Sequence, residues 1–154
     1  MLRLLTMQAR TRHELAEALR RRNVPAEVAE SVLDRMTEVG LVDDAAFAEA
    51  WVSSRQQRKH LSRTGLRQEL HRKGVDRDLV AEAIDQVSGE AEVEAAQALA
   101  HKKLRSTRGL EPHVQRRRIA AALARRGFGG DTVATVLREL PIGENSADSG
   151  ETFP

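Results

Sequence analysis

The sequence predicts an all-α protein, arranged as an elongated tandem array of three-helix repeats. One pattern occurs three times, beginning at Leu15, Leu66 and Ile119, about fifty residues apart each time. In each copy a first apolar residue is followed, four positions later, by a second one. A basic pair, a residue that tolerates positive φ, and a final apolar residue, the anchor, come next. Aromatic residues make up only 3% of the chain, which favours helices over sheets. Repeats of one helical unit favour a long binding face over a small-substrate pocket.

The first predicted repeat spans residues 1–60. Its first helix begins at Thr11, where Glu14 completes a capping box, and ends at Asn23, a residue that tolerates the left-handed conformation. Pro25 suits the first turn of the second helix, which ends at Gly40. Its expected buried stripe consists of Val28, Val32, Leu33 and Met36.

The third helix of this repeat is expected to begin at Asp43 or Asp44. Tandem acids before an apolar-periodic segment are typical of an N-cap and a first turn, and no nearby nucleophile or metal ligand suggests a catalytic pair. Phe47 and Trp51 are four residues apart, and we interpret them, with Val52, as core residues. The alternative for Trp51 is a role at a protein interface, where tryptophan is enriched.

The second predicted repeat spans residues 61–110 and the third, shortened repeat spans residues 111–141. The second has expected helix starts at Ser62 or Thr64, at Asp76, and at Ser88 or Gly89, and Gly74 ends its first helix. The third is expected to start after Pro112, with Gly127 as a stop, Asp131 as a cap and Pro141 at its end. Residues 142–154 are rich in Gly, Ser, Asp and Glu and are predicted to be a disordered tail.

Charge is distributed in bands along the chain, although the formal net charge is only +2. Two basic bands, residues 55–73 and 102–126, flank an acidic stretch at residues 76–94. Clustered Arg and Lys suit a polyanion or an acidic protein surface, whereas solvated helix faces are the alternative. The candidate residues for binding a partner or DNA are Arg55, Arg58, Lys59, Arg63, Arg67, Arg72, Lys73, Lys102, Lys103, Arg105, Arg116, Arg117, Arg118, Arg125 and Arg126.

Several functional classes find no support in the sequence. The chain has no cysteine, its five histidines show no metal-binding spacing, and there is no phosphate-binding GxxxxGK motif, so no metal or cofactor is expected. The GxxG at Gly127–Gly130 lacks the neighbouring sheet of a nucleic-acid-binding KH domain, and we interpret it as a helix stop and turn. No apolar run could span a membrane and the N-terminus does not resemble a signal peptide, so a cytoplasmic protein is expected.

Four segments form a recognisable set: Gly40–Arg55, Arg63–Asp76, Lys102-Lys103 and Arg125-Arg126-Gly127-Phe128. Together they resemble the RecX family, regulators of the RecA recombinase. The resemblance implies tandem three-helix repeats without enzymatic activity. It also implies binding in the helical groove of the RecA–single-stranded-DNA filament, with inhibition of ATPase, strand exchange and coprotease activities. Two departures are Asn23, where the family usually has Gly, and fewer residues before the first repeat.

The function expected from these observations is regulation of RecA by a monomeric protein that bridges neighbouring filament subunits. Single-stranded DNA is a second candidate partner. One alternative is a stand-alone nucleic-acid-binding protein that contacts phosphates without reading sequence, because stacking aromatics are scarce. The other alternative is a helical adaptor for a different protein. An enzyme is not expected, because no set of catalytic residue types converges in the sequence.

Overall fold

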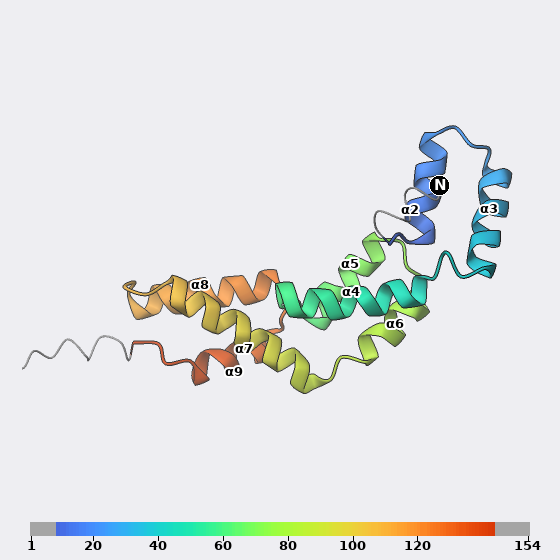
Figure 1. Ribbon diagram of the computed structural model, residues 1–154. Helices are drawn as coiled ribbons and strands as arrows, with labels where there is room; N and C mark the ends of the chain where they lie inside the picture. Colours follow the sequence, from blue (N-terminus) through green and yellow to red (C-terminus); the bar gives the residue numbers. More distant parts are fainter. Residues whose placement is uncertain (1–8, 144–154) are drawn as a thin grey trace, which may run out of the picture. The chain divides into compact units, whose positions relative to one another are not determined.

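The structure is a computed structural model, and it describes residues 9–143. Every helix or strand assigned within this range is an α-helix, which confirms the all-α prediction (Figure 1). The chain divides into two compact units. Unit 1 comprises residues 1–58 and 66–87, and unit 2 comprises residues 59–65 and 88–154. The helices are α2 (Arg12–Arg21), α3 (Ala26–Glu38), α4 (Asp44–Lys59), α5 (Arg63–Arg72), α6 (Arg77–Asp85), α7 (Gly89–Ser106), α8 (Pro112–Arg125) and α9 (Gly130–Glu139).

The repeated pattern corresponds to one repeated helix ending. Helices α2, α5 and α8 each end in a residue with positive φ, namely Asn23 (59°), Gly74 (76°) and Gly127 (89°). In each case the next residue donates its backbone N–H to the carbonyl five positions earlier, a Schellman motif. These bonds join Val24 to Leu19 (3.1 Å), Val75 to Leu70 (3.2 Å) and Phe128 to Leu123 (3.2 Å). The apolar anchor of the pattern is therefore the residue that closes the helix end.

Most of the predicted helix starts are present. Thr11 and Glu14 form the capping box of α2, and Asp76 and Ser88 cap α6 and α7 through their side chains. Asp43 Oδ1 accepts a hydrogen bond from Ala46 N at the start of α4 (3.0 Å). The prediction for Asp131 was wrong. Helix α9 begins after Gly129 without a side-chain cap, and Asp131 lies in its first turn, where its negative charge interacts favourably with the helix dipole.

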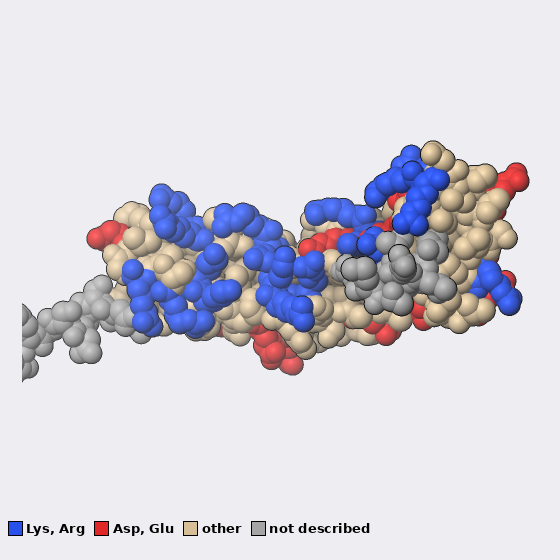
Figure 2. All heavy atoms as spheres, turned by 45° about the horizontal axis from the view of Figure 1, so that its top comes forward, with Lys and Arg blue, Asp and Glu red and all other residues tan. Residues whose placement is uncertain are grey.

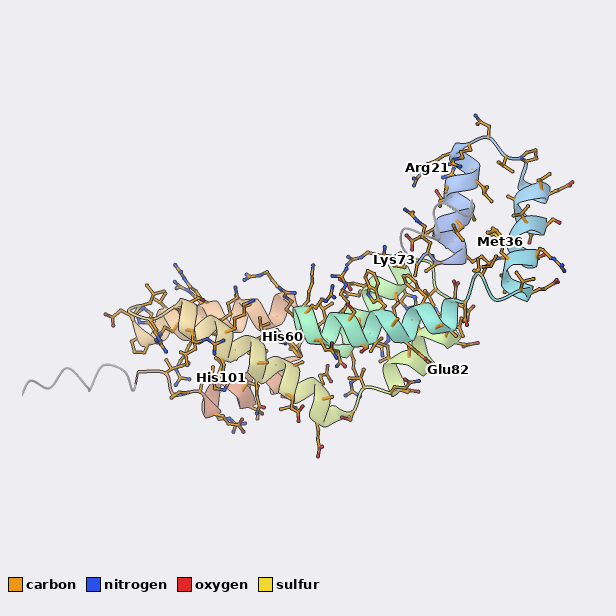
Figure 3. The ribbon with its side chains drawn as sticks, in the orientation of Figure 1. Arg21, Met36, His60, Lys73, Glu82 and His101 are labelled. Atoms are coloured by element: carbon orange, nitrogen blue, oxygen red, sulfur yellow. The ribbon has the colours of Figure 1, made fainter. Side chains whose placement is uncertain are left out.

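Unit 1 has a small core between α2 and α3, built from Leu15, Leu33, Met36 and Val42. In Figure 3 Met36 lies between these two helices. The expected burial of Val28 and Val32 was wrong, because their side chains are 51% and 39% exposed. Successive residues of a helix point about 100° apart, so Val32 turns away from the core that Leu33 enters.

The buried residues of α4 also differ from the prediction. Ala48 (0% exposed) and Val52 (6%) are buried, whereas Phe47 and Trp51 are only partly buried. The larger aromatic rings lie along the neighbouring stripe of the helix, where Trp51 contacts Arg55 of α4, Glu69 of α5 and Lys73 just after α5. Trp51 is therefore an element of a polar cluster and not a core residue.

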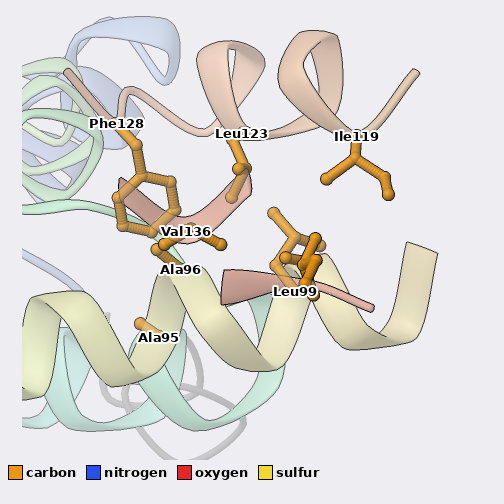
Figure 4. Packing of buried hydrophobic residues seen from close by; sticks show 9 residues of the cluster. Ala95, Ala96, Leu99, Ile119, Leu123, Phe128 and Val136 are labelled. Atoms are coloured by element: carbon orange, nitrogen blue, oxygen red, sulfur yellow. The ribbon is translucent and has the colours of Figure 1, made fainter. Parts of the chain in front are cut away.

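In unit 2, α7, α8 and α9 pack against one another around a shared hydrophobic cluster (Figure 4). Ile119 and Leu123 of α8 are fully buried against Leu99 of α7 and Val136 of α9. Ile142, which the sequence placed at the start of the tail, packs against this cluster. The rest of the predicted tail, residues 144–154, lies outside the described residues.

Candidate partner-binding surfaces

Most of the predicted basic residues of unit 2 lie on α7 and α8. Figure 2 shows Lys and Arg side chains covering much of the visible face of this unit. Side chains that the structure leaves exposed are those of Lys59, Lys102, Arg105, Arg116, Arg117, Arg118 and Arg125, and Lys103 is partly exposed. Within the described residues none of these eight forms an ion pair with a carboxylate. They are therefore available to a negatively charged partner.

Three of these cations line one recess between α7 and α8. The recess has a volume of about 220 Å³, and its lining residues are Lys103, Ser106, Thr107, Arg118, Ala121 and Arg125. Arg118, Ala121 and Arg125 repeat at helical spacing, so they form one stripe of α8. Lys103 and Thr107 form the facing stripe of α7. No carboxylate lines this recess.

Two other predicted residues of unit 2 are committed to internal contacts. Arg63 donates from its backbone N (3.1 Å) and its Nε (2.8 Å) to the two carboxylate oxygens of Glu92. Arg126 donates from Nη1 to the carbonyl of Lys59 (2.9 Å). These two arginines connect segments of unit 2 that are distant in sequence, so their first role is structural.

The predicted binding residues of unit 1 are of two kinds: exposed side chains, and side chains that contact Trp51. Arg58, Arg67 and Arg72 are exposed. Arg55 Cζ lies 4.2 Å from the centroid of the Trp51 ring and Lys73 Nζ lies 5.0 Å from it, both at distances of cation–π contacts. Figure 3 shows Lys73 at the end of α5 nearest α2. Arg55 and Lys73 are therefore oriented before any partner arrives.

Carboxylates and a second ring complete this arrangement around Trp51. Trp51 Nε1 donates to Glu69 Oε2 (2.9 Å), and Arg55 Nε lies 3.4 Å from the same oxygen. Lys73 Nζ lies 3.5 Å from Glu14 Oε2. Phe47 stacks on Trp51 with ring centroids 5.6 Å apart. Because ring and cations already contact each other, Trp51 does not present an open platform for a nucleobase.

His60 lies beside the basic residues of unit 2. It has a positive φ of 50° in the connection between α4 and α5. Burial lowers the pKa of His60 from its usual value, and the positive charges of Lys102 and Arg126 lower it further. The protonated imidazole is thus disfavoured among these cations. From the sequence the histidines were considered only as metal ligands, and Lys102 and Arg126 are remote from His60 in sequence.

Other classes of site are not found in the described part of the chain. Between residues 9 and 143 no three His, Cys, Asp or Glu side chains are grouped so that they could hold a metal ion. No helix in the same range has both the length and the hydropathy needed to cross a bilayer. A further recess of about 820 Å³, near Arg105, Arg108 and Gln115, also lies in unit 2. The polar side chain of Gln115 is occupied there, since its Nε2 donates to Thr107 O (2.9 Å).

Sequence reasoning did not anticipate the polar residues that cover the carbonyl groups at the end of α7. Ser106 Oγ and Thr107 Oγ1 both donate to Lys103 O (2.9 Å each), and Gln115 covers Thr107 O. Ser-Thr near the end of a long helix was the available signal, because such hydroxyls bond to carbonyls three or four residues earlier. The carbonyl oxygens of Lys103 and Thr107, two residues that line the recess, therefore already accept hydrogen bonds from side chains.

Models of one protein family match most of the chain. They are described as the first, second and third three-helix domains of RecX, and they match residues 1–36, 43–84 and 90–137. This division differs in phase from the predicted repeats, because it groups α4 with α5 and α6, and α7 with α8 and α9.

Relatives named "Regulatory protein RecX" match over nearly the same span. The Streptomyces coelicolor protein is 49% identical over 138 residues, which cover 90% of this chain and 73% of the relative. The Thermobifida fusca protein is also 49% identical over 138 residues, with 90% and 75% covered. The Mycobacterium marinum protein is 45% identical over 148 residues, with 96% and 83% covered.

Solved structures support the same assignment at the level of the fold. A crystal structure of regulatory protein RecX is 26% identical, with a TM-score of 0.78, and the match covers 90% of this chain and 68% of that one. RecX from Lactobacillus salivarius is 23% identical with the same TM-score, and 90% of each chain is covered. The three domain matches, the sequence relatives and the shared helical fold show that this chain belongs to the RecX family.

Proposed function

We propose that this protein regulates the RecA recombinase by binding in the groove of the RecA–single-stranded-DNA filament. Bound there, it inhibits the ATPase, strand-exchange and coprotease activities of RecA. The observation that carries the proposal is the membership of a family of regulatory proteins, together with exposed cations on both units. The protein acts as a cytoplasmic monomer without a cofactor and without catalysis of its own.

The mechanism follows from restriction of movement. Hydrolysis of ATP by a filament subunit requires that neighbouring subunits change position, and a protein that binds two neighbours favours one of these positions. Residues Arg58, Arg67 and Arg72 of unit 1 and the free cations of α7 and α8 supply the contacts. The predicted division into repeats at residues 1–60, 61–110 and 111–141 would give each filament contact its own helical unit.

The cations of the proposed interface differ in how ready they are for binding. Arg55 and Lys73 are already fixed by Trp51, Glu69 and Glu14, so ordering them on binding costs less side-chain entropy. Arg67 and Arg72 lie on the exposed face of α5 and must be ordered by the partner. We assign the long-range attraction of the partner to the free arginines. The cations around Trp51 supply contacts of fixed geometry.

The test is the DNA-stimulated ATP hydrolysis of RecA with and without this protein. Inhibition at substoichiometric amounts supports the proposal and favours action at filament ends or by propagated filament loss. An unchanged rate of hydrolysis and of strand exchange, even with the protein in excess, rejects it. Charge reversal at Arg67 and Arg72 identifies which surface is used, since these side chains have no internal carboxylate partner among the described residues.

The second candidate is a stand-alone nucleic-acid-binding protein. The cation-lined surface of unit 2 favours it, because phosphate contacts do not require RecA. It predicts strongly salt-dependent DNA binding by the protein alone and no specific effect on RecA. The two candidates are separated by measuring DNA affinity and RecA inhibition on the same preparation.

A further inference from the structure

We infer that the recess formed by Lys103, Arg118 and Arg125 is a binding site for the phosphodiester backbone of single-stranded nucleic acid. This inference rests on the proposed function, because it assigns the DNA backbone of the protein–DNA filament as the part that unit 2 contacts. The recess lies entirely within unit 2, between α7 and α8. Its lining contains three cations and no carboxylate, so its potential is positive.

The electrostatic argument begins with the three cations themselves. None of them has a carboxylate partner within the described residues, although unit 2 contains Glu90, Glu92, Glu94 and Glu139. Glu92 is committed to Arg63, and Glu139 accepts a hydrogen bond from Gln97. Keeping three like charges close together without a counter-charge is unfavourable unless a ligand supplies one. An anion of matching size is the ligand that removes this cost.

The end of α7 would ordinarily disfavour an anion, since the carbonyl groups of a helix C-terminus carry partial negative charge. Here hydroxyl and amide groups cover three carbonyls at this helix end. The one O–H of Thr107 is shared between the carbonyls of Lys103 (2.9 Å) and Leu104 (3.1 Å), and Ser106 also donates to that of Lys103. Gln115, only 7% exposed, covers the carbonyl of Thr107 itself. The polar residues therefore reduce the repulsion that an approaching phosphate would meet.

The geometry favours a linear polyanion over a single small ion. Arg118 and Arg125 are two turns apart on α8, which separates their Cα atoms by about 10 Å. Ala121 lies between them along α8 and also lines the recess, and its side chain is small. The exposed side chains of Lys102, Arg105 and Arg117 continue the positive charge beyond the recess. A strand with regularly spaced phosphates can contact these cations in succession.

The site does not read bases. Phe128 is the aromatic residue of the described part of unit 2, and it is only 5% exposed because it belongs to the core. No Phe, Tyr or Trp ring is exposed in the described part of unit 2, so contacts are made chiefly to phosphates. A site of this kind suits a filament regulator, because the bound DNA has no fixed sequence.

The test uses the full chain without RecA and a fluorescent oligothymidylate as the probe. The triple variant Lys103→Gln, Arg118→Gln and Arg125→Gln removes the charge of the recess. The variant Arg20→Gln, Arg21→Gln and Arg22→Gln removes the same charge from the exposed end of α2 in unit 1. Circular dichroism confirms that both variants keep their helices.

We expect the recess variant to lose at least about tenfold in affinity. Three lost contacts should also reduce the slope of log affinity against log salt by about 2, at roughly 0.7 per contact with a single strand. The α2 variant should stay within about twofold of the parent, since its charges lie outside the binding surface. Equal losses in the two variants, or an unchanged recess variant, overturn the inference. So does competition by polyglutamate as effective as that by DNA of equal charge, because the site would then accept acidic peptides.

Failure of the inference and failure of the proposed function give different results. If DNA binding depends on the recess but the protein leaves RecA ATPase unchanged, the proposed function is rejected and the phosphate site is supported. Full inhibition of RecA by the recess variant, with unchanged DNA affinity, rejects the phosphate site alone.

Discussion

Thr11 at the start of α2 donates a hydrogen bond from Oγ1 to the carbonyl of Lys73 at the end of α5 (2.6 Å). Ser62, at the start of α5, makes the equivalent bond to the carbonyl of Arg126 at the end of α8 (2.9 Å). In both junctions the N-cap hydroxyl of one repeated helix meets the C-cap carbonyl of the next repeated helix. The positive end of one helix dipole thus lies against the negative end of another, inside unit 1 and again inside unit 2.

The first prediction concerns the buried hydroxyl of Thr11. Thr11 is fully buried, and Thr11→Val keeps its shape while removing the cap of Glu14 N and the donor to Lys73 O. We expect the free energy of unfolding to fall by about 2 kcal/mol, because a buried carbonyl loses its partner. Urea unfolding followed by circular dichroism measures this change. The control is Thr135→Val, whose hydroxyl donates only within α9, to Asp131 O. Equal unfolding midpoints for the two variants would contradict the assigned role of the junction.

The second prediction separates two reasons for glycine at a helix end. A Cβ on Gly74 would lie 2.2 Å from His13 Cγ, whereas a Cβ on Gly40 would meet nothing within 4 Å. Both glycines have nearly the same positive φ, 76° and 78°. We expect Gly74→Asn to destabilise the protein by at least about 2 kcal/mol more than Gly40→Asn. Asn can adopt the positive φ at both positions, but at position 74 its Cβ would clash with His13. Thermal unfolding of the two variants side by side is the measurement.

The same comparison explains why Asn replaces glycine in the first repeat. Asn23 has the required positive φ of 59° and is exposed, so position 23 restricts only the backbone conformation and not the size of the side chain. We therefore expect Asn23→Gly to change stability by less than about 1 kcal/mol. A large loss of stability in this variant would show that the Asn23 side chain has a further role.

The third prediction distinguishes binding arginines from structural ones on α5. Arg67→Ala with Arg72→Ala should weaken inhibition of RecA at least about tenfold without changing stability, because both side chains are exposed. Arg63→Ala should instead lower the free energy of unfolding by about 1 kcal/mol, since it removes the partly exposed contact with Glu92. Inhibition assays and urea unfolding on both variants test this division. It fails if Arg63→Ala impairs inhibition as strongly as the double variant while the fold stays equally stable.

The fourth prediction concerns pH. The folded protein lowers the pKa of His60, so the unfolded chain binds a proton there more readily than the folded protein. Stability from this group is complete above the usual histidine pKa of 6.5 and decreases as the pH falls towards the lower folded value. His60→Asn, which tolerates the positive φ, should reduce the loss of stability between about pH 7.5 and about pH 5.5. An unchanged pH dependence of urea unfolding in this variant would show that His60 does not contribute.

Local relationships along the chain determined much of this structure. The capping box joins Thr11 to Glu14, three residues away, and the helix ends at Asn23, Gly74 and Gly127 depend on a single backbone conformation each. Helical spacing placed Leu66, Leu70, Ile119 and Leu123 in the core, and all four are fully buried. These features involve one turn of helix or one residue, so the sequence alone was sufficient to predict them.

Contacts between distant segments decided which charges are free and which faces are buried. The sequence grouped Arg63 with Arg67 and Arg126 with Arg125, but only packing brought Glu92 to Arg63 and the carbonyl of Lys59 to Arg126. Packing likewise left Val32 exposed and placed cations over Trp51. The helical period of a sequence specifies the direction of each side chain within its own helix. It does not specify which neighbouring helix that side chain meets, and this was determined only by the tertiary structure.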